Sequence, residues 1–195
     1  ADENCYRRRA QRQSDRCDQR RNGRESFSNQ VGLCQPVNAH VIDADVPGIR
    51  QLVNIFEETA ESVIALMEVP QSEVHQYGVI KGREIKKRLY QVEATVEKPL
   101  AKDAPSRMAI IGRYVLRPEI FRILQNLPPG RGGEIQLTDG LSQLVRERKI
   151  FGCEFVGDRY DIGDKFGFVR ATVAYALKRP DLRDKVLEYL KTIPN

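Results

Sequence analysis

The chain has 195 residues, 41% of them hydrophobic and 30% charged, which is ordinary for a folded protein with one domain-sized core. Its apolar runs are far shorter than the roughly 20 residues that a membrane-spanning helix needs, and no signal peptide opens the sequence. We therefore expect a cytoplasmic protein without membrane contact.

Residues 1–40 differ from the rest of the chain. They hold eight arginines, five acidic residues, no lysine and three of the four cysteines, so most of the net charge of +5 lies here. The cysteine spacings match no zinc pattern, and neither helical nor strand periodicity is present. Three interpretations stay open: an Arg-rich irregular segment that is disordered, a basic arm for nucleic acid, or an out-of-frame translation. Nucleic-acid binding is disfavoured, because aromatic residues do not interleave with the arginines.

Local patterns in the first half of residues 41–195 predict a helix followed by strands. Asp45 is placed to cap the helix, and Pro47 lies close to its first turn. Apolar residues then recur at helical spacing: Ile49, Leu52, Val53 and Phe56. A buried strand, a short strand, a turn and a strand with one buried face are predicted at 62–69, 77–80, Lys81-Gly82 and 89–97.

The second half continues the alternation of strands and helices. Pro118 lies in the first turn of a helix, Thr138 or Asp139 starts another, Asp164 opens a third, and Pro180 begins the last. Strands are predicted at 107–116 and 151–156, with a loop at 128–133. Alternating strands and helices indicate an α/β fold built on a layered sheet.

A Glu-Lys-Pro triplet, Glu97-Lys98-Pro99, ends the predicted strand 89–97. In one interpretation its charges are simply solvated at a strand end. In the other they reach a ligand at the carboxyl edge of the sheet, where open α/β sheets bind ligands. A carboxylate accepts hydrogen bonds from sugar hydroxyls and a lysine offers a point charge to phosphate, while Pro99 would hold the turn rigid.

Two further positions each have a structural and a functional interpretation. Gly78 is either a turn glycine or a place where the backbone approaches a ligand closely. Asp161 precedes a glycine turn and a helix start. It is either a capping residue, as Asp164 is expected to be, or a ligand of Mg²⁺, which takes oxygen ligands beside substrate phosphates.

Four stretches occur together in a known order. They are VHQYGVI, VEKPLAKDAPSRMAIIGRYVL, LPPGRGGEIQLTDGL and RYDIGDKFGFVRATVAYAL. In this order and at similar spacing, the chain resembles bacterial UTP–glucose-1-phosphate uridylyltransferases, the UDP-glucose pyrophosphorylases of the sugar nucleotidyltransferase family. The resemblance covers residues 41–195 and matches the C-terminal part of the family's nucleotidyltransferase domain.

The resemblance implies a partial Rossmann-like α/β domain with a mixed sheet flanked by helices. It also implies an enzyme that converts UTP and glucose 1-phosphate to UDP-glucose and pyrophosphate with Mg²⁺, in a homo-oligomer. By motif, Glu97 would hold glucose hydroxyls and Lys98 would be the catalytic and phosphate-binding residue. Gly78 would contact the sugar through its backbone, Ile110 would line the glucose pocket, and Asp161 would bind the metal.

The sequence also departs from the family pattern. It contains no glycine-rich loop of the type GxGTRxLPxTK, and Asn38-Ala39-His40 precedes Val41-Ile42-Asp43 where the family has a metal-binding Gly-Asp-Asp. We therefore expect a truncated chain that retains the sugar-phosphate half of the site without the nucleotide half. The alternative is a noncatalytic module that binds sugar phosphate or serves assembly.

Overall fold

The central feature of the fold is a mixed β-sheet of six strands in the spatial order β1-β6-β3-β7-β5-β4. The computed structural model describes residues 32–34, 40–130 and 133–193. The strands are β1 (Gly32–Cys34), β3 (Ser62–Glu68), β4 (Gly78–Lys86), β5 (Leu89–Glu97), β6 (Met108–Leu116) and β7 (Ile150–Glu154). β3 and β7 run parallel, and the other described pairs in this sheet are antiparallel. Because β4 also pairs with β6 through Val79 and Ala109, strands β6, β3, β7, β5 and β4 close into a ring, and β1 pairs with β6 outside it.

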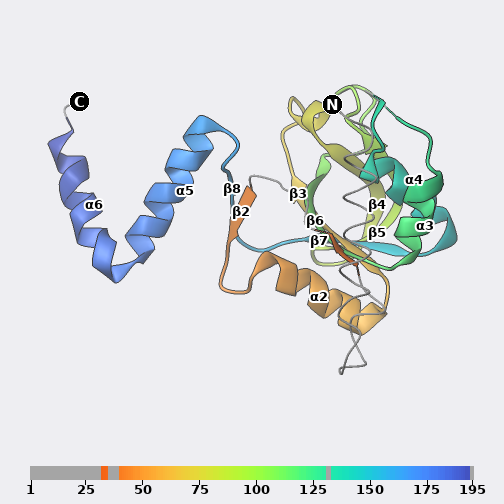
Figure 1. Ribbon diagram of the computed structural model, residues 1–195, viewed down its shortest axis with the longest axis horizontal. Coiled ribbons are helices and arrows are strands. Elements are labelled where there is room, and N and C mark those ends of the chain that lie inside the picture. Colours follow the sequence, from red (N-terminus) through yellow and green to blue (C-terminus); the bar gives the residue numbers. More distant parts are fainter. Residues whose placement is uncertain (1–31, 35–39, 131–132, 194–195) are drawn as a thin grey trace.

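A second, two-stranded sheet joins the C-terminal helices to this body. Its strands β2 (His40–Asp43) and β8 (Asp158–Asp161) are antiparallel. Beyond β8 the last two helices project away from the main sheet as an arm (Figure 1). The helices are α2 (Gly48–Thr59), α3 (Glu119–Asn126), α4 (Leu137–Glu147), α5 (Lys165–Lys178) and α6 (Pro180–Thr192), with a 3₁₀ turn η1 at Val74–Gln76.

Two hydrophobic clusters lie on opposite faces of β3. Val63 and Ala65 pack in the cluster that contains α2, whereas Ile64 and Leu66 pack in the cluster that contains α3 and α4. Successive strand residues point to opposite faces, so a strand that is covered on both sides must be apolar at every position. This explains the uninterrupted apolar run of β3.

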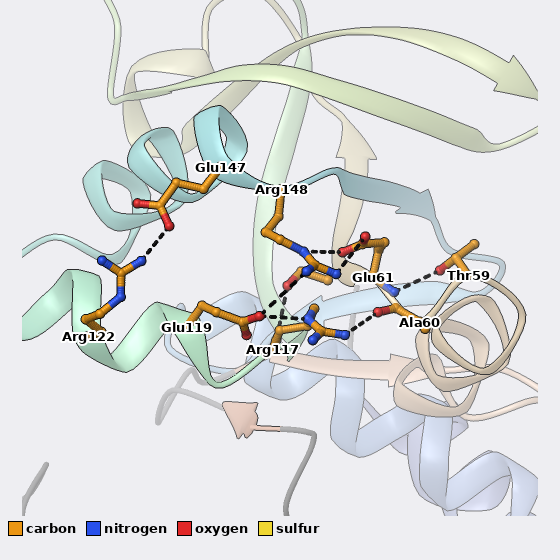
Figure 2. Close-up of polar contacts among 9 residues, drawn as sticks. Thr59, Ala60, Glu61, Arg117, Glu119, Arg122, Glu147 and Arg148 are labelled. Atoms are coloured by element: carbon orange, nitrogen blue, oxygen red, sulfur yellow. Dashed lines mark hydrogen bonds and ion pairs between the residues drawn. The ribbon is translucent and has the colours of Figure 1, made fainter.

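Four charged residues form an ion-pair network that ties several chain segments together (Figure 2). Arg148 donates to both carboxylate oxygens of Glu61, at 3.2 Å from Nε and 3.0 Å from Nη2. Oε1 of Glu119 lies 3.9 Å from Nη1 of Arg148 and accepts a 3.1 Å hydrogen bond from Nε of Arg117. The network thereby joins the residue before β3, the residue after β6, the first residue of α3 and the residue that follows α4.

The α/β prediction with a mixed sheet and flanking helices is confirmed, and so are the bounds of the strand 89–97. The predicted cap of α5 is also confirmed, because the Asp164 carboxylate accepts a hydrogen bond from the Gly167 amide at 2.8 Å. The predicted turn at Lys81-Gly82 is wrong. β4 continues through a bulge at this point, and the hairpin turns beside Arg88, which has a φ of 64°.

Other sequence-based boundaries shift by a few residues. The N-cap of α2 is Pro47, which has no side-chain cap, so the expected capping role of Asp45 is wrong. α4 begins at Leu137, one or two residues earlier than the expected start at Thr138 or Asp139. Most of the segment 1–40 lies outside the described residues. None of the helices that the structure describes has the length and apolar character required to span a bilayer.

Candidate functional site

The Glu97-Lys98 pair lies where β5 ends beside the start of β4. Glu97 is directly opposite Gly78 in the strand register, and the Lys98 amide donates a 3.0 Å hydrogen bond to the carbonyl of Tyr77. The Lys98 ammonium lies 3.9 Å from Oε1 of Glu97. The lysine side chain is 49% exposed and the glutamate 17%, so the ammonium faces solvent beside a mostly covered carboxylate.

Lys98 has a left-handed backbone, with a φ of 44°. This conformation costs an L-residue about 1–2 kcal/mol, because its Cβ crowds the following carbonyl. The Pro99 ring restricts the backbone of Lys98 further. Strain of this kind persists only where the surroundings enforce it, and it concentrates at functional sites. The turn therefore directs the Lys98 side chain in a way that an ordinary strand end would not.

Gly78 is required by close packing. A Cβ at this position would lie 2.8 Å from Oγ1 of Thr138 and 3.1 Å from Oε2 of Glu97. Thr138 is buried in the first turn of α4, and its carbonyl accepts a 2.7 Å hydrogen bond from Oγ1 of Thr95 in β5. The absence of a side chain at Gly78 thus lets both α4 and the Glu97 carboxylate approach the start of β4.

Asp161 ends β8, and both of its carboxylate oxygens contact described groups. Oδ1 accepts a 3.0 Å hydrogen bond from the Gly163 amide, and Oδ2 lies 3.4 Å from Nη2 of Arg159. A Cβ at Gly167 would fall 1.9 Å from the Asp161 carbonyl oxygen, so the first turn of α5 packs directly on the Asp161 backbone. Asp161 is therefore held in place by its own loop and by α5.

The described residues can be tested as a magnesium site. In the part of the chain that the structure describes, no three His, Cys, Asp or Glu residues gather to hold a metal ion. Mg²⁺ can be bound by one or two carboxylates together with waters and substrate phosphates. The single carboxylate of Asp161 fits only this second kind of site, and its contact with the Arg159 guanidinium disfavours a second cation. Its role as a metal ligand stays a prediction.

Arg159 links Asp161 to the start of β4. Nη1 of Arg159 lies 3.3 Å from the Tyr77 hydroxyl, and Cζ lies 5.3 Å from the centroid of the Tyr77 ring. A second guanidinium, that of buried Arg113 in β6, is close enough to be affected by this charge. Burial lowers the pKa of Arg113, and the positive charge of Arg159 lowers it further. Two arginines, one of them paired with Asp161, thus interact electrostatically in this region.

The structure brings together some of the predicted site residues. Gly78, Glu97 and Lys98 are adjacent, and Asp161 connects to them through Arg159 and Tyr77. Ile110 is only 6% exposed and belongs to the hydrophobic cluster that includes Ile80, so its described contacts are those of a core residue.

Sequence reasoning did not select Tyr77, Thr138 or Arg159 as site residues. Arg159 and Asp161 are two positions apart in a strand and therefore share a face, which is the one local signal that could have paired them. The contact between Tyr77 and Arg159 joins residues 82 positions apart, which no local pattern indicates.

Comparisons with known proteins place this arrangement in a family. The family model described as "Nucleotidyl transferase" matches residues 34–177, which is most of the chain. The chain belongs to the nucleotidyl transferase family.

Among curated proteins, the UTP–glucose-1-phosphate uridylyltransferase of Streptococcus pneumoniae is 52% identical over 146 residues, which are 74% of this chain and 49% of that protein. The enzyme of the same name from Staphylococcus haemolyticus is 44% identical over 153 residues, which are 78% of this chain and 53% of that protein. The chain therefore spans about half the length of these relatives.

Solved structures give the same picture. A UDP-glucose pyrophosphorylase complexed with UDP-glucose superposes with a TM-score of 0.72 at 37% identity, covering 77% of this chain and 58% of that one. A UTP-bound UGPase from Acinetobacter baumannii superposes with a TM-score of 0.70 at 26% identity, covering 80% of this chain and 54% of that one. The fold of these two solved structures is thus shared over 77% and 80% of this chain.

Proposed function

We propose that this chain acts in the joining of UTP and glucose 1-phosphate to UDP-glucose and pyrophosphate, and that its described residues form the sugar-phosphate side of the site. The observation that carries the proposal is the strained Lys98 next to Glu97. Glu97 lies opposite Gly78, where a side chain would clash with Thr138. The relatives and neighbours that bear this activity in their names support the choice of reaction.

In the proposed reaction, an oxygen of the sugar phosphate attacks the α-phosphorus of UTP and pyrophosphate leaves. The chain's own residues would position the sugar phosphate and reduce the repulsion between two anions. Lys98 would contact the phosphate, and Glu97 would accept hydrogen bonds from glucose hydroxyls. Gly78 would let the backbone approach the sugar, and Ile110 would line the glucose pocket. Magnesium bound with the nucleotide would supply further positive charge to its phosphates, and Asp161 is the described carboxylate that could hold it.

The first test is calorimetric titration of the full chain with glucose 1-phosphate. We expect binding that Lys98→Ala weakens by about tenfold to 100-fold, the range that corresponds to one charge-assisted hydrogen bond. Lys102→Ala is the matched control, because Lys102 is also exposed and lies four residues further along. Release of pyrophosphate from UTP is then measured with and without Mg²⁺. Absence of binding, or equal binding by both variants, would contradict the proposal.

We also propose that the chain forms a homo-oligomer through the arm of α5 and α6. α6 buries none of its side chains in the chain itself, and large apolar residues are exposed on both helices. These residues are Phe166, Phe168, Val169, Tyr175, Leu187, Tyr189 and Leu190. Light scattering should give a multiple of 22.3 kDa, and Leu190→Glu should reduce the mass whereas Phe121→Glu on α3 should not. A monomeric parent chain would refute this proposal.

A further inference from the structure

Tyr77 connects the Lys98 turn to the loop that holds Asp161. Its carbonyl accepts the Lys98 amide at 3.0 Å, and its hydroxyl lies 3.3 Å from Nη1 of Arg159. Tyr77 itself packs against the cluster of Val69, Val74, Val79 and Ala109. Its backbone and its side chain therefore contact two different segments of the candidate site.

Arg159 reaches both segments from β8. Its side chain is only 10% exposed, and it contacts the Tyr77 ring, the Tyr77 hydroxyl and the Asp161 carboxylate. A guanidinium can make several such contacts at once because its donors lie in a rigid plane, whereas the ammonium of a lysine cannot. Arg159 is thus built into a fixed relation with both Tyr77 and Asp161.

Arg159 is largely buried and is ion-paired with Asp161. Its positive charge also lowers the pKa of the buried Arg113 side chain. The Arg159 guanidinium at Tyr77 would add positive potential that favours an anionic ligand such as a sugar phosphate.

We propose that Arg159 is a positioning residue for the Glu97-Lys98 turn, which it fixes through Tyr77 while Asp161 anchors its guanidinium from the other side. The inference rests on the proposed function for its ligand, glucose 1-phosphate, but its structural part is independent of that ligand. Because Lys98 has a strained backbone, the Tyr77 carbonyl that accepts its amide is one of the contacts that keep the turn in place.

Calorimetric titration of the full chain with glucose 1-phosphate tests the functional part. Arg159→Gln should weaken binding about tenfold, the size of one lost hydrogen bond to a charged group. Arg159→Lys should not restore it, and Tyr77→Phe combined with Arg159→Gln should cost less than the sum of the two single changes. Arg122→Gln removes an exposed ion-paired arginine on α3 and serves as the control with unchanged affinity. Unchanged affinity in Arg159→Gln, or full rescue by lysine, would overturn the inference.

Amide hydrogen exchange separates this inference from the proposed function. In Arg159→Gln the exchange protection of the Lys98 amide should fall about tenfold, while the protection of β3 amides stays as in the parent chain. This measurement needs no ligand. If the parent chain fails to bind glucose 1-phosphate, the proposed function fails, and the Lys98 amide alone decides the positioning role. Unchanged exchange at Lys98, or an equal loss of protection in β3, would refute it.

Discussion

The backbone of Lys98 allows the strain at the candidate site to be measured directly. A left-handed conformation costs an L-residue about 1–2 kcal/mol, and glycine does not have this cost. A glycine variant in turn has about 0.4–1 kcal/mol less folding stability, because its unfolded chain has greater conformational freedom. The difference predicts that Lys98→Gly is more stable than Lys98→Ala by about 0.5–1 kcal/mol. Both variants lose the ammonium, so the comparison isolates the backbone.

Urea unfolding, followed by circular dichroism, provides the free energies of unfolding. Arg88 serves as a positive control, because it also has a positive φ but lies in the β4–β5 hairpin, and its glycine variant should again exceed its alanine variant. Lys102 serves as the opposite control. It is exposed and is not among the residues with positive φ, so alanine should there be the more stable replacement. If Lys98→Ala equals or exceeds Lys98→Gly while both controls behave as expected, the strain argument is wrong.

Three further outcomes follow from individual side chains. Gly78→Ala should lower the free energy of unfolding by about 1–3 kcal/mol and weaken glucose 1-phosphate binding, because the new methyl group overpacks against Thr138. Urea unfolding measures the first effect and calorimetric titration the second. Burial raises the pKa of Glu119, but its backbone hydrogen bond and the nearby arginines outweigh this and lower it overall. The parent chain is therefore more stable than Glu119→Gln above the unfolded pKa of about 4.3, and it loses this advantage as pH falls through the folded pKa. Equal acid unfolding curves for the two chains would contradict this. Burial, followed by the Glu154 charge, raises the pKa of Cys153 to about 11. Iodoacetamide at pH 8, mapped by mass spectrometry, should thus leave Cys153 unmodified until the chain unfolds, and rapid labelling of the folded chain would show that the thiol is accessible.

Strong local patterns made much of the main sheet predictable. The apolar run of β3 predicted a buried strand, and alternation in 89–97 predicted β5 with its observed bounds. Asp164 was predictable as a cap because a short carboxylate just before a helix can accept a hydrogen bond from an amide of the first turn. In these places the local preference and the tertiary structure agree.

The remainder depends on contacts that are distant in sequence. β2 and β8 are four residues each and contain charged residues, so neither shows a clear strand pattern, and they form because they pair with one another. The β4–β5 hairpin has Arg88 in a left-handed conformation at its turn, although glycine is the residue usually preferred at such a position. The same limit applies to the site, where Glu97 and Lys98 could be selected from a motif but the Tyr77–Arg159 contact could not.

The ion pair between Glu61 and Arg148 has a consequence for the order of folding. It joins residues 87 positions apart, so folding must first bring these distant positions close to each other. We expect this contact to be absent from the folding transition state and present only in the native chain. Arg148→Ala should then accelerate unfolding and leave the folding rate nearly unchanged, whereas a slower folding limb in the denaturant dependence would mean that the pair forms early. If the pair forms late, as we expect, the network determines how long the folded chain persists more than how quickly the chain folds.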